Sequence, residues 1–233
     1  MAKPTVRILC IDGGGIRGAA PLRILQDLCD IETRQPYQMF DVICGTSTGG
    51  LIAILLGMLK MDINKVVELY RDIGNQVFPY KGYISKLSGY FWNGEMYSSD
   101  NLKEIIIDQL ALSLFNFPVD KEKLEKAENL KMSDFPGPGN EQPYVFVVAN
   151  RNNSPYFFRN YKYGYQNTDK SVGTDQVKIW EAIRATTAAP TYFKHIQIRI
   201  GSADFKFVDG GVGPWSALSV GPVGPWPYQT LWW

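Results

Sequence analysis

A serine stands at the centre of the segment Gly45-Thr-Ser-Thr-Gly49, between a short apolar run and a longer one. At a sharp turn from a strand into a helix, such a serine can present its hydroxyl as a nucleophile, and the glycines Gly45 and Gly49 allow the tight turn. The N–H groups that open the next helix favour a developing negative charge. A glycine-rich turn with a helix-capping serine fits the same residues, but the position between strand and helix favours Ser47 as a nucleophile.

A second glycine-rich segment, Asp12-Gly-Gly-Gly-Ile-Arg-Gly18, follows the first apolar run and opens a helix. It fits the Gly-x-Gly-x-x-Gly pattern of a dinucleotide site, which also needs an acidic residue at the end of the second strand. Here the second strand begins with Asp41 and ends at the Ser47 turn. The other interpretations are an oxyanion hole made by glycine N–H groups, with Arg17 near a substrate's negative charge, or a plain turn. The segment around Ser47 lacks the Gly-Lys pair of a P-loop, since Leu51 follows Gly49 and Gly50.

Ser47 needs a partner that accepts its proton, and the sequence offers two. Asp209 opens an Asp-Gly-Gly segment after a short apolar run, although such a tripeptide alone is most often a turn. His195 is the single histidine, and the order Ser, His, Asp differs from that of known triads. A Ser47–Asp209 dyad is therefore the simpler interpretation, provided that partial burial raises the pKa of Asp209.

The segments around these residues alternate between strands and helices. Short β-branched or apolar runs predict strands over residues 6–11, 41–44, 144–149, 156–159 and 205–208. Helical spacing predicts helices over residues 20–33, 48–59, 63–73, 102–110, 121–131 and 179–187, with Asp62 capping the third and Ser99 or Asp100 the fourth. The 48–59 helix is apolar all round and is expected in the core. This order predicts an α/β fold with a parallel core.

Composition narrows the class of protein. The chain has 233 residues, 45% of them hydrophobic, and a formal net charge of +1, so it is expected to be one domain without nucleic acid as a partner. Three cysteines without metal-ligand spacing predict reduced thiols, no metal site and an intracellular, cytoplasmic protein. The longest apolar run is too short to cross a bilayer, and no secretory signal is visible.

Two segments stand apart from this pattern. Residues 79–98 are rich in glycine and aromatic residues, which predicts a functional or mobile loop. Residues 212–233 hold four of the six tryptophans and no charged residue, and they follow no period, which predicts irregular structure. The expected division is therefore a domain over residues 6–211 and a tail over 212–233.

Taken together and in order, DGGGIRG at 12–18, GTSTG at 45–49 and DGG at 209–211 resemble the patatin-like phospholipase family. The Ala-rich segment 182–190 resembles the family too, so the resemblance spans residues 6–211. It implies an α/β fold in three layers, a mostly parallel central sheet flanked by helices. It also implies calcium-independent hydrolysis of acyl esters in phospholipids, lysophospholipids or other glycerolipids, without a cofactor or metal, with a peripheral membrane surface as a possible partner.

Carried over residue by residue, the resemblance makes Ser47 the nucleophile, Asp209 the general base and Gly210 the turn residue behind it. It makes Arg17 a contact for the lipid phosphate and assigns the oxyanion hole to the N–H groups of Gly13, Gly14 and Gly15.

The chain departs from the family after residue 211, where the family continues with an Asn-Asn-Pro-like segment and a helix and this sequence reads Val212-Gly-Pro-Trp. A catalytically inactive or regulatory lipid-binding module is therefore the main alternative to an active hydrolase. A nucleotide-binding oxidoreductase is a third alternative, disfavoured by the missing acidic residue.

Overall fold

The computed structural model describes residues 5–77, 98–115, 117–138, 142–162, 173–190 and 192–212. The aromatic loop expected at 79–98 lies outside the described residues except for its last position, and the tail expected at 212–233 lies outside them from residue 213 onward.

The strands fall where the sequence places them, with two additions. They are β1 (Ile8–Ile11), β2 (Val42–Thr46), β3 (Tyr144–Arg151), β4 (Ser154–Arg159), β5 (Gly173–Thr174), β6 (Ile196–Ile200) and β7 (Ala203–Asp209). The added strand β6 alternates isoleucine with polar residues, which is the period of a half-buried strand and was a readable signal. The other addition, β5, is two residues long and carries no such signal.

The expected helices are all present, and there is one additional short helix that was not expected. They are α1 (Ala19–Glu32), α2 (Pro36–Met39), α3 (Thr48–Ala53), α4 (Ile63–Val77), α6 (Ser99–Leu114), α7 (Lys121–Asn129) and α8 (Ile179–Thr186). The short one is α2, which begins at a proline. Shorter turns lie at η1 (Gly15–Gly18), η2 (Ile54–Met58) and η3 (Met132–Asp134).

Two helix starts test the expected caps. Asp62 caps α4 as expected, since its Oδ1 accepts a hydrogen bond of 2.9 Å from the N–H of Asn64. The expected cap of α6, Ser99 or Asp100, is wrong: the hydroxyl of Ser98 accepts the hydrogen bond from the N–H of Asn101. Ser98 has the extended backbone that a cap requires, which moves the other two residues into the first turn.

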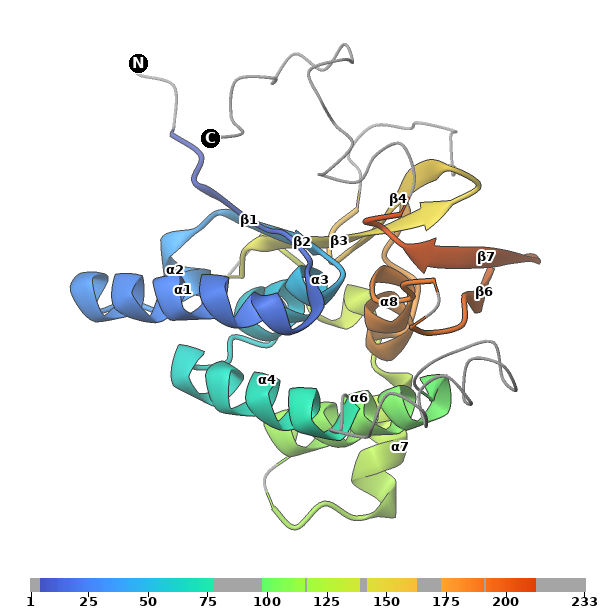
Figure 1. The fold of residues 1–233 in the computed structure, drawn as a ribbon, viewed down its shortest axis with the longest axis horizontal. Helices are drawn as coiled ribbons and strands as arrows, with labels where there is room; N and C mark the ends of the chain where they lie inside the picture. The colour runs from blue at the N-terminus through green and yellow to red at the C-terminus, as the bar shows by residue number, and fades with distance from the viewer. Residues whose placement is uncertain are drawn as a thin grey trace, which may run out of the picture.

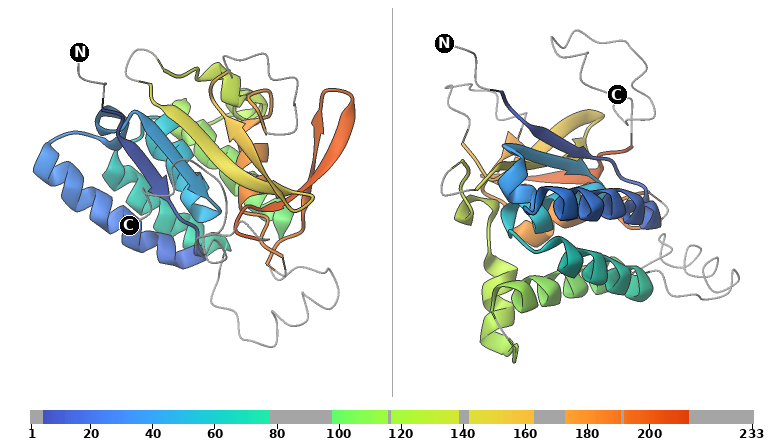
Figure 2. Two further views of the ribbon diagram at one scale, coloured as in Figure 1. Left: turned by 90° about the horizontal axis from the view of Figure 1, so that it is seen from above. Right: turned by 90° about the vertical axis from the view of Figure 1, so that its left-hand side faces the viewer.

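The sheet is mixed around a parallel core. Strands β1, β2 and β3 are parallel neighbours, β4 is antiparallel to β3, and β5 is parallel to β4. The β6–β7 pair forms an antiparallel hairpin that joins the sheet through β3. Figure 2 shows this hairpin extending away from the other strands. The predicted α/β fold, with parallel strands flanked by helices, is confirmed.

Strand β3 brings the ends of two other strands together. On one side, β4 runs along residues 146–151 of β3. On its other side, β2 pairs with β3 as far as Thr46↔Val148, and β7 takes the next position with Asp209↔Ala149. Because β2 is parallel and β7 antiparallel to β3, their carboxyl ends meet head to head on the same flank.

The helices form two layers on the sheet, so the molecule has three layers in all (Figure 1). Helices α1, α3 and α8 lie next to the sheet, and α4, α6 and α7 lie beyond them (Figures 1 and 2). The predicted core helix 48–59 is confirmed as buried, but it passes from α3 into the π-helical turn η2 at Ile54.

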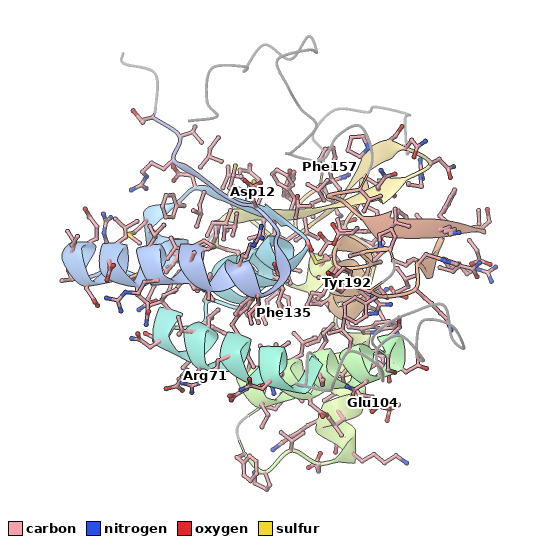
Figure 3. The ribbon with its side chains drawn as sticks, in the orientation of Figure 1. Asp12, Arg71, Glu104, Phe135, Phe157 and Tyr192 are labelled. Atoms are coloured by element: carbon pink, nitrogen blue, oxygen red, sulfur yellow. The ribbon has the colours of Figure 1, made fainter. Side chains whose placement is uncertain are left out.

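The two faces of the sheet differ in burial. Side chains on the helix side, such as Ile43, Val145 and Phe158, are completely buried. On the opposite side Ile8 is 48% exposed, and Phe157 points away from the helices (Figure 3). Within the described residues, no helix is both long and apolar enough to span a bilayer.

Candidate active site

Ser47 occupies the turn between β2 and α3. Its backbone angles are φ 56° and ψ −130°, in a region that residues with a side chain rarely adopt. The Ser47 carbonyl accepts the N–H groups of Gly50 and Leu51, which begins the helix immediately. A backbone held in so rare a conformation is typical of a functional position, where the surrounding structure enforces it.

The glycines on either side make this turn possible through close packing. A Cβ atom on Gly45 would stand 2.2 Å from the carbonyl oxygen of Gly49. A Cβ on Gly49 would stand 2.1 Å from the carbonyl oxygen of Ile11 on β1. Any side chain at either position would overlap backbone atoms, so the turn can close only with glycine at both.

A threonine that the sequence analysis did not single out fixes the turn from the other side. The Thr186 hydroxyl accepts a hydrogen bond of 2.9 Å from the N–H of Ser47 and donates one of 2.6 Å to the carbonyl of Val148 on β3. Thr186 is fully buried at the end of α8. It therefore ties the Ser47 turn, β3 and α8 together. Its only sequence signal was its place in the Ala-rich segment 182–190.

Asp209 lies at the end of β7, 3% exposed, and the Ser47 side chain lies close enough to its carboxyl group to lower the pKa of that group. Its Oδ1 also accepts the N–H of Gly211 at 2.7 Å, and its own N–H donates to the carbonyl of Ala188. Burial raises the pKa of Asp209 to about 6, against the opposing effect of the bonds from Ser47 and Gly211. Above that pH the group is mainly a carboxylate beside a serine side chain, an arrangement that suits a base and a nucleophile.

The glycine segment after β1 packs against Ser47. A Cβ atom on Gly13 would stand 2.5 Å from the Cβ of Ser47 and 3.3 Å from its Oγ, so the bare backbone approaches the serine closely. Gly14 and Gly15 follow at φ 151° and 56°, and lie further round the loop. The carbonyl of Gly15 accepts hydrogen bonds from the hydroxyls of Tyr70 and Thr48. The loop is thus anchored to α3 and α4 while its first glycine faces the serine.

Arg17 lies on the exposed side of this loop, in the short helix η1. Its side chain covers Gly14, since a Cβ there would stand 3.3 Å from the Cβ of Arg17. Asp12, at the start of the loop, is also exposed and lies where β1 passes into the helical layer (Figure 3). Arg17 pairs with no carboxylate of the described residues, so its charge faces solvent.

His195 is exposed and lies immediately before β6. Partial burial, and then the charge of Lys206, lower the pKa of His195. Among the described residues, the groups found to interact with the Asp209 carboxyl are Ser47 and Gly211, not this imidazole.

The described residues contain no cluster of three or more histidine, cysteine, aspartate or glutamate side chains that could hold a metal ion. A separate hollow of about 640 Å³ lies beside the 133–138 loop and is lined by Tyr144, Asn160 and Asp175 among others. None of Ser47, Asp209 and the glycine loop lines it.

Comparisons with known proteins place the chain in a family. The family model described as patatin-like phospholipase matches residues 9–218. Calcium-independent phospholipase A2-gamma of Homo sapiens is 34% identical over 192 residues, which cover 81% of this chain and 22% of that protein. The Mus musculus protein of the same name is 33% identical, with the same coverage. Patatin group M-3 of Solanum tuberosum is 27% identical over 225 residues, covering 89% of this chain and 49% of the relative.

Among solved structures, VipD from Legionella pneumophila resembles the chain with a TM-score of 0.46 and 15% identity, over 90% of this chain and 46% of VipD. The chain spans about a fifth of the length of its phospholipase A2-gamma relatives, namely 22%.

Proposed function

The chain belongs to the patatin-like phospholipase family, and we propose that it hydrolyses acyl ester bonds in phospholipids, lysophospholipids or other glycerolipids. In this proposal Ser47 forms the acyl intermediate, Asp209 is the general base, and no step requires calcium or a cofactor. The catalytic unit is residues 6–211, which include both of these side chains and the glycine loop. The family match covers residues 9–218, which includes this unit from residue 9 onward and continues past its proposed end.

One observation carries the proposal: the Ser47 side chain lies close enough to the buried carboxyl group of Asp209 to lower the pKa of that group. The two side chains come from strand ends that meet at adjacent positions of β3. A nucleophile within reach of a base is the minimum that covalent acyl transfer requires.

In the first half of the reaction, Asp209 takes the proton of Ser47 as the serine oxygen bonds to the ester carbonyl carbon. The carbonyl oxygen becomes an oxyanion, which the backbone N–H groups of Gly13, Gly14 and Gly15 are proposed to stabilise. The close packing of Gly13 on Ser47 supports this assignment. The C–O bond of the ester then breaks, and Asp209 returns its proton to the departing alcohol.

In the second half, Asp209 takes a proton from water, whose oxygen bonds to the acyl carbon of the intermediate. Breaking of the bond to Ser47 releases the fatty acid, and the proton on Asp209 returns to the serine oxygen. A pKa of about 6 suits both directions, because the group is mainly ionised at neutral pH and still gains a proton readily.

Arg17 is proposed to meet the phosphate of a phospholipid substrate, and its exposed position beside the glycine loop supports this role. The substrate would lie in a membrane or micelle surface, so peripheral contact with lipid is part of the proposal.

Labelling with a fluorophosphonate probe tests the nucleophile. Trypsin releases Ser47 in the peptide of residues 35–60, where it is the only serine, so a probe adduct is assigned by mass spectrometry. We expect one adduct on this peptide and none in Ser47→Ala. Turnover of diacylphospholipid, lysophospholipid and neutral glycerolipid micelles, each with and without EDTA, then identifies the substrate class.

A protein that is folded by circular dichroism but takes no label would contradict the proposal. If wild type and Ser47→Ala then bind vesicles equally and neither cleaves an ester, the lipid-binding alternative replaces it.

A further inference from the structure

Two cysteines lie side by side on adjacent strands, on the face of the sheet away from the helices. Cys10 of β1 and Cys44 of β2 are register partners in a parallel pair, so their side chains point to the same face. Their sulfur atoms are 3.2 Å apart, with the thiol of Cys44 donating a hydrogen bond to Cys10. Cys10 is exposed and Cys44 is buried.

The spacing of the strands suits a covalent bond between these sulfurs. Neighbouring strands lie about 4.8 Å apart, within the range of Cα separations of about 4.4–6.8 Å that disulfides span. The sulfurs need to approach each other by only about 1 Å to reach bonding distance. Small side-chain rotations therefore suffice, without displacement of either strand.

The environment makes the two thiols unequal. The hydrogen bond from Cys44 holds the pKa of Cys10 below the usual thiol value, although burial and the charge of Asp12 oppose it. The same bond, together with burial, raises the pKa of Cys44. An exposed sulfur with thiolate character reacts first with an oxidant, and here that sulfur is Cys10. The neighbouring thiol of Cys44 is then in position to react with the oxidised Cys10.

We propose that Cys10 and Cys44 form a peroxide-reactive dithiol that closes into a reversible intramolecular disulfide. The Cys10 thiolate attacks hydrogen peroxide, gains one oxygen as a sulfenic acid and releases hydroxide. Cys44 then loses its proton to that hydroxide or to the departing oxygen, and its sulfur bonds to the sulfur of Cys10. Overall, two thiols and one peroxide give one disulfide and two molecules of water. A dithiol reductant reverses the step by exchange.

The disulfide would join the two strands that lead into the site. Cys10 lies two residues before Asp12, where the glycine loop begins, and Cys44 lies three residues before Ser47. The proposal concerns sulfur chemistry only and is independent of the proposed hydrolysis.

Peptide mapping tests it, because trypsin separates the three cysteines. Cys10 falls in residues 8–17, Cys29 in 24–34 and Cys44 in 35–60. The full chain is reduced, freed of reductant, treated with hydrogen peroxide and then alkylated. We expect a linked pair of the 8–17 and 35–60 peptides, two hydrogen atoms lighter than their sum, which dithiothreitol abolishes. The free thiols, counted in denaturant, should fall from three to one.

Two variants separate the steps, each first checked for native circular dichroism. In Cys44→Ser the linkage should be absent and dimedone should trap a sulfenic acid on the 8–17 peptide. Cys29→Ser is the matched control, since Cys29 is buried in α1, and it should form the linkage at the wild-type rate.

Three results would overturn the proposal. One is an 8–17 peptide that stays reduced. Another is a Cys10 that is oxidised to sulfinic acid equally fast in wild type and Cys44→Ser. The third is a linkage that joins two chains, seen as a dimer on a non-reducing gel.

Discussion

The two halves of the candidate site are held in place by different kinds of interaction. Ser47 is held by close packing, because the backbone around Gly45 and Gly49 leaves no room for a side chain at either position. The buried hydroxyl of Thr186 also accepts a hydrogen bond from the N–H of Ser47. Asp209 is held by hydrogen bonds at the end of β7, which contacts β3 through only two register pairs. Close packing therefore fixes the turn that carries Ser47. By contrast, the buried carboxylate of Asp209 lowers the free energy of unfolding when it is ionised.

This contrast has a consequence for substitutions. Substitutions around Ser47 should destabilise the protein by disrupting the turn. Substitution of Asp209 should lower activity and at the same time increase the stability of the protein. Four predictions test this difference, from the largest expected effect to the smallest.

Asp209→Asn should lower kcat by about 10³-fold, since a positioned general base contributes about 10²–10⁴. The same variant should be more stable at pH 8. A carboxyl group whose pKa is raised from its ordinary value of 3.8 to about 6 costs up to about 3 kcal/mol when ionised. Ester turnover and urea denaturation measure the two effects. Ser47→Ala is the control, losing activity without gaining stability; an Asp209→Asn protein with wild-type kcat would remove Asp209 from the mechanism.

Gly45→Ala should destabilise the chain by at least about 3 kcal/mol, because the new methyl group would overlap the carbonyl of Gly49. Gly74→Ala is the matched control. It lies within α4, and a Cβ there meets nothing within 4 Å, so the change should stabilise by about 0.5–1 kcal/mol. Thermal unfolding of both proteins gives the comparison. Equal melting temperatures would show that the turn tolerates a side chain.

Thr186→Val should cost about 2–4 kcal/mol and lower kcat at least about tenfold, because it leaves the N–H of Ser47 and the carbonyl of Val148 unpaired in the interior. Thr186→Ser keeps the hydroxyl and should retain most of both properties. Urea denaturation and turnover are measured on the two variants side by side. If the valine and serine variants behave alike, Thr186 stabilises the Ser47 turn through packing and not through its hydrogen bonds.

The pH dependence of kcat/KM should follow the ionisation of Asp209. Activity should be flat above about pH 7 and fall to about a tenth of that level at pH 5. Stability should change in the opposite direction: the contribution of this carboxyl is fully present below about pH 4 and is lost as pH rises through about 6. The two curves come from initial rates and urea midpoints across the pH range.

His195→Ala serves as the control for that profile, because it removes the other group that titrates in the same range. The profile should keep its midpoint in this variant. A midpoint that moves or disappears would assign the ionisation to the imidazole.

The sequence predicted best the features that local turn chemistry determines. The glycines around Ser47 and those of the 12–18 segment imply sharp turns by themselves, and the structure has turns at both places. The buried helix after Ser47 was readable from its apolar character on all sides.

Long-range geometry was not readable. The head-to-head meeting of β2 and β7 on one flank of β3 depends on strand order and register, and no local pattern encodes either. Thr186 was missed for the same reason, since its hydroxyl bridges two backbone groups from distant parts of the chain. The alternation within Ile196–Ile200 could have revealed β6, although no strand was predicted there.

The hydrogen bond between Ser47 and Thr186 also has a consequence for the order of events during synthesis of the chain. Thr186 follows Ser47 by 139 residues, so at ribosomal rates of about 5–20 residues per second roughly 7–28 s separate the synthesis of the turn from that of its partner. Throughout that interval the N–H of Ser47 lacks the Thr186 hydroxyl that later accepts its hydrogen bond. Synthesis of the glycine turn therefore precedes its final fixation, which becomes possible only after residue 186 has been added.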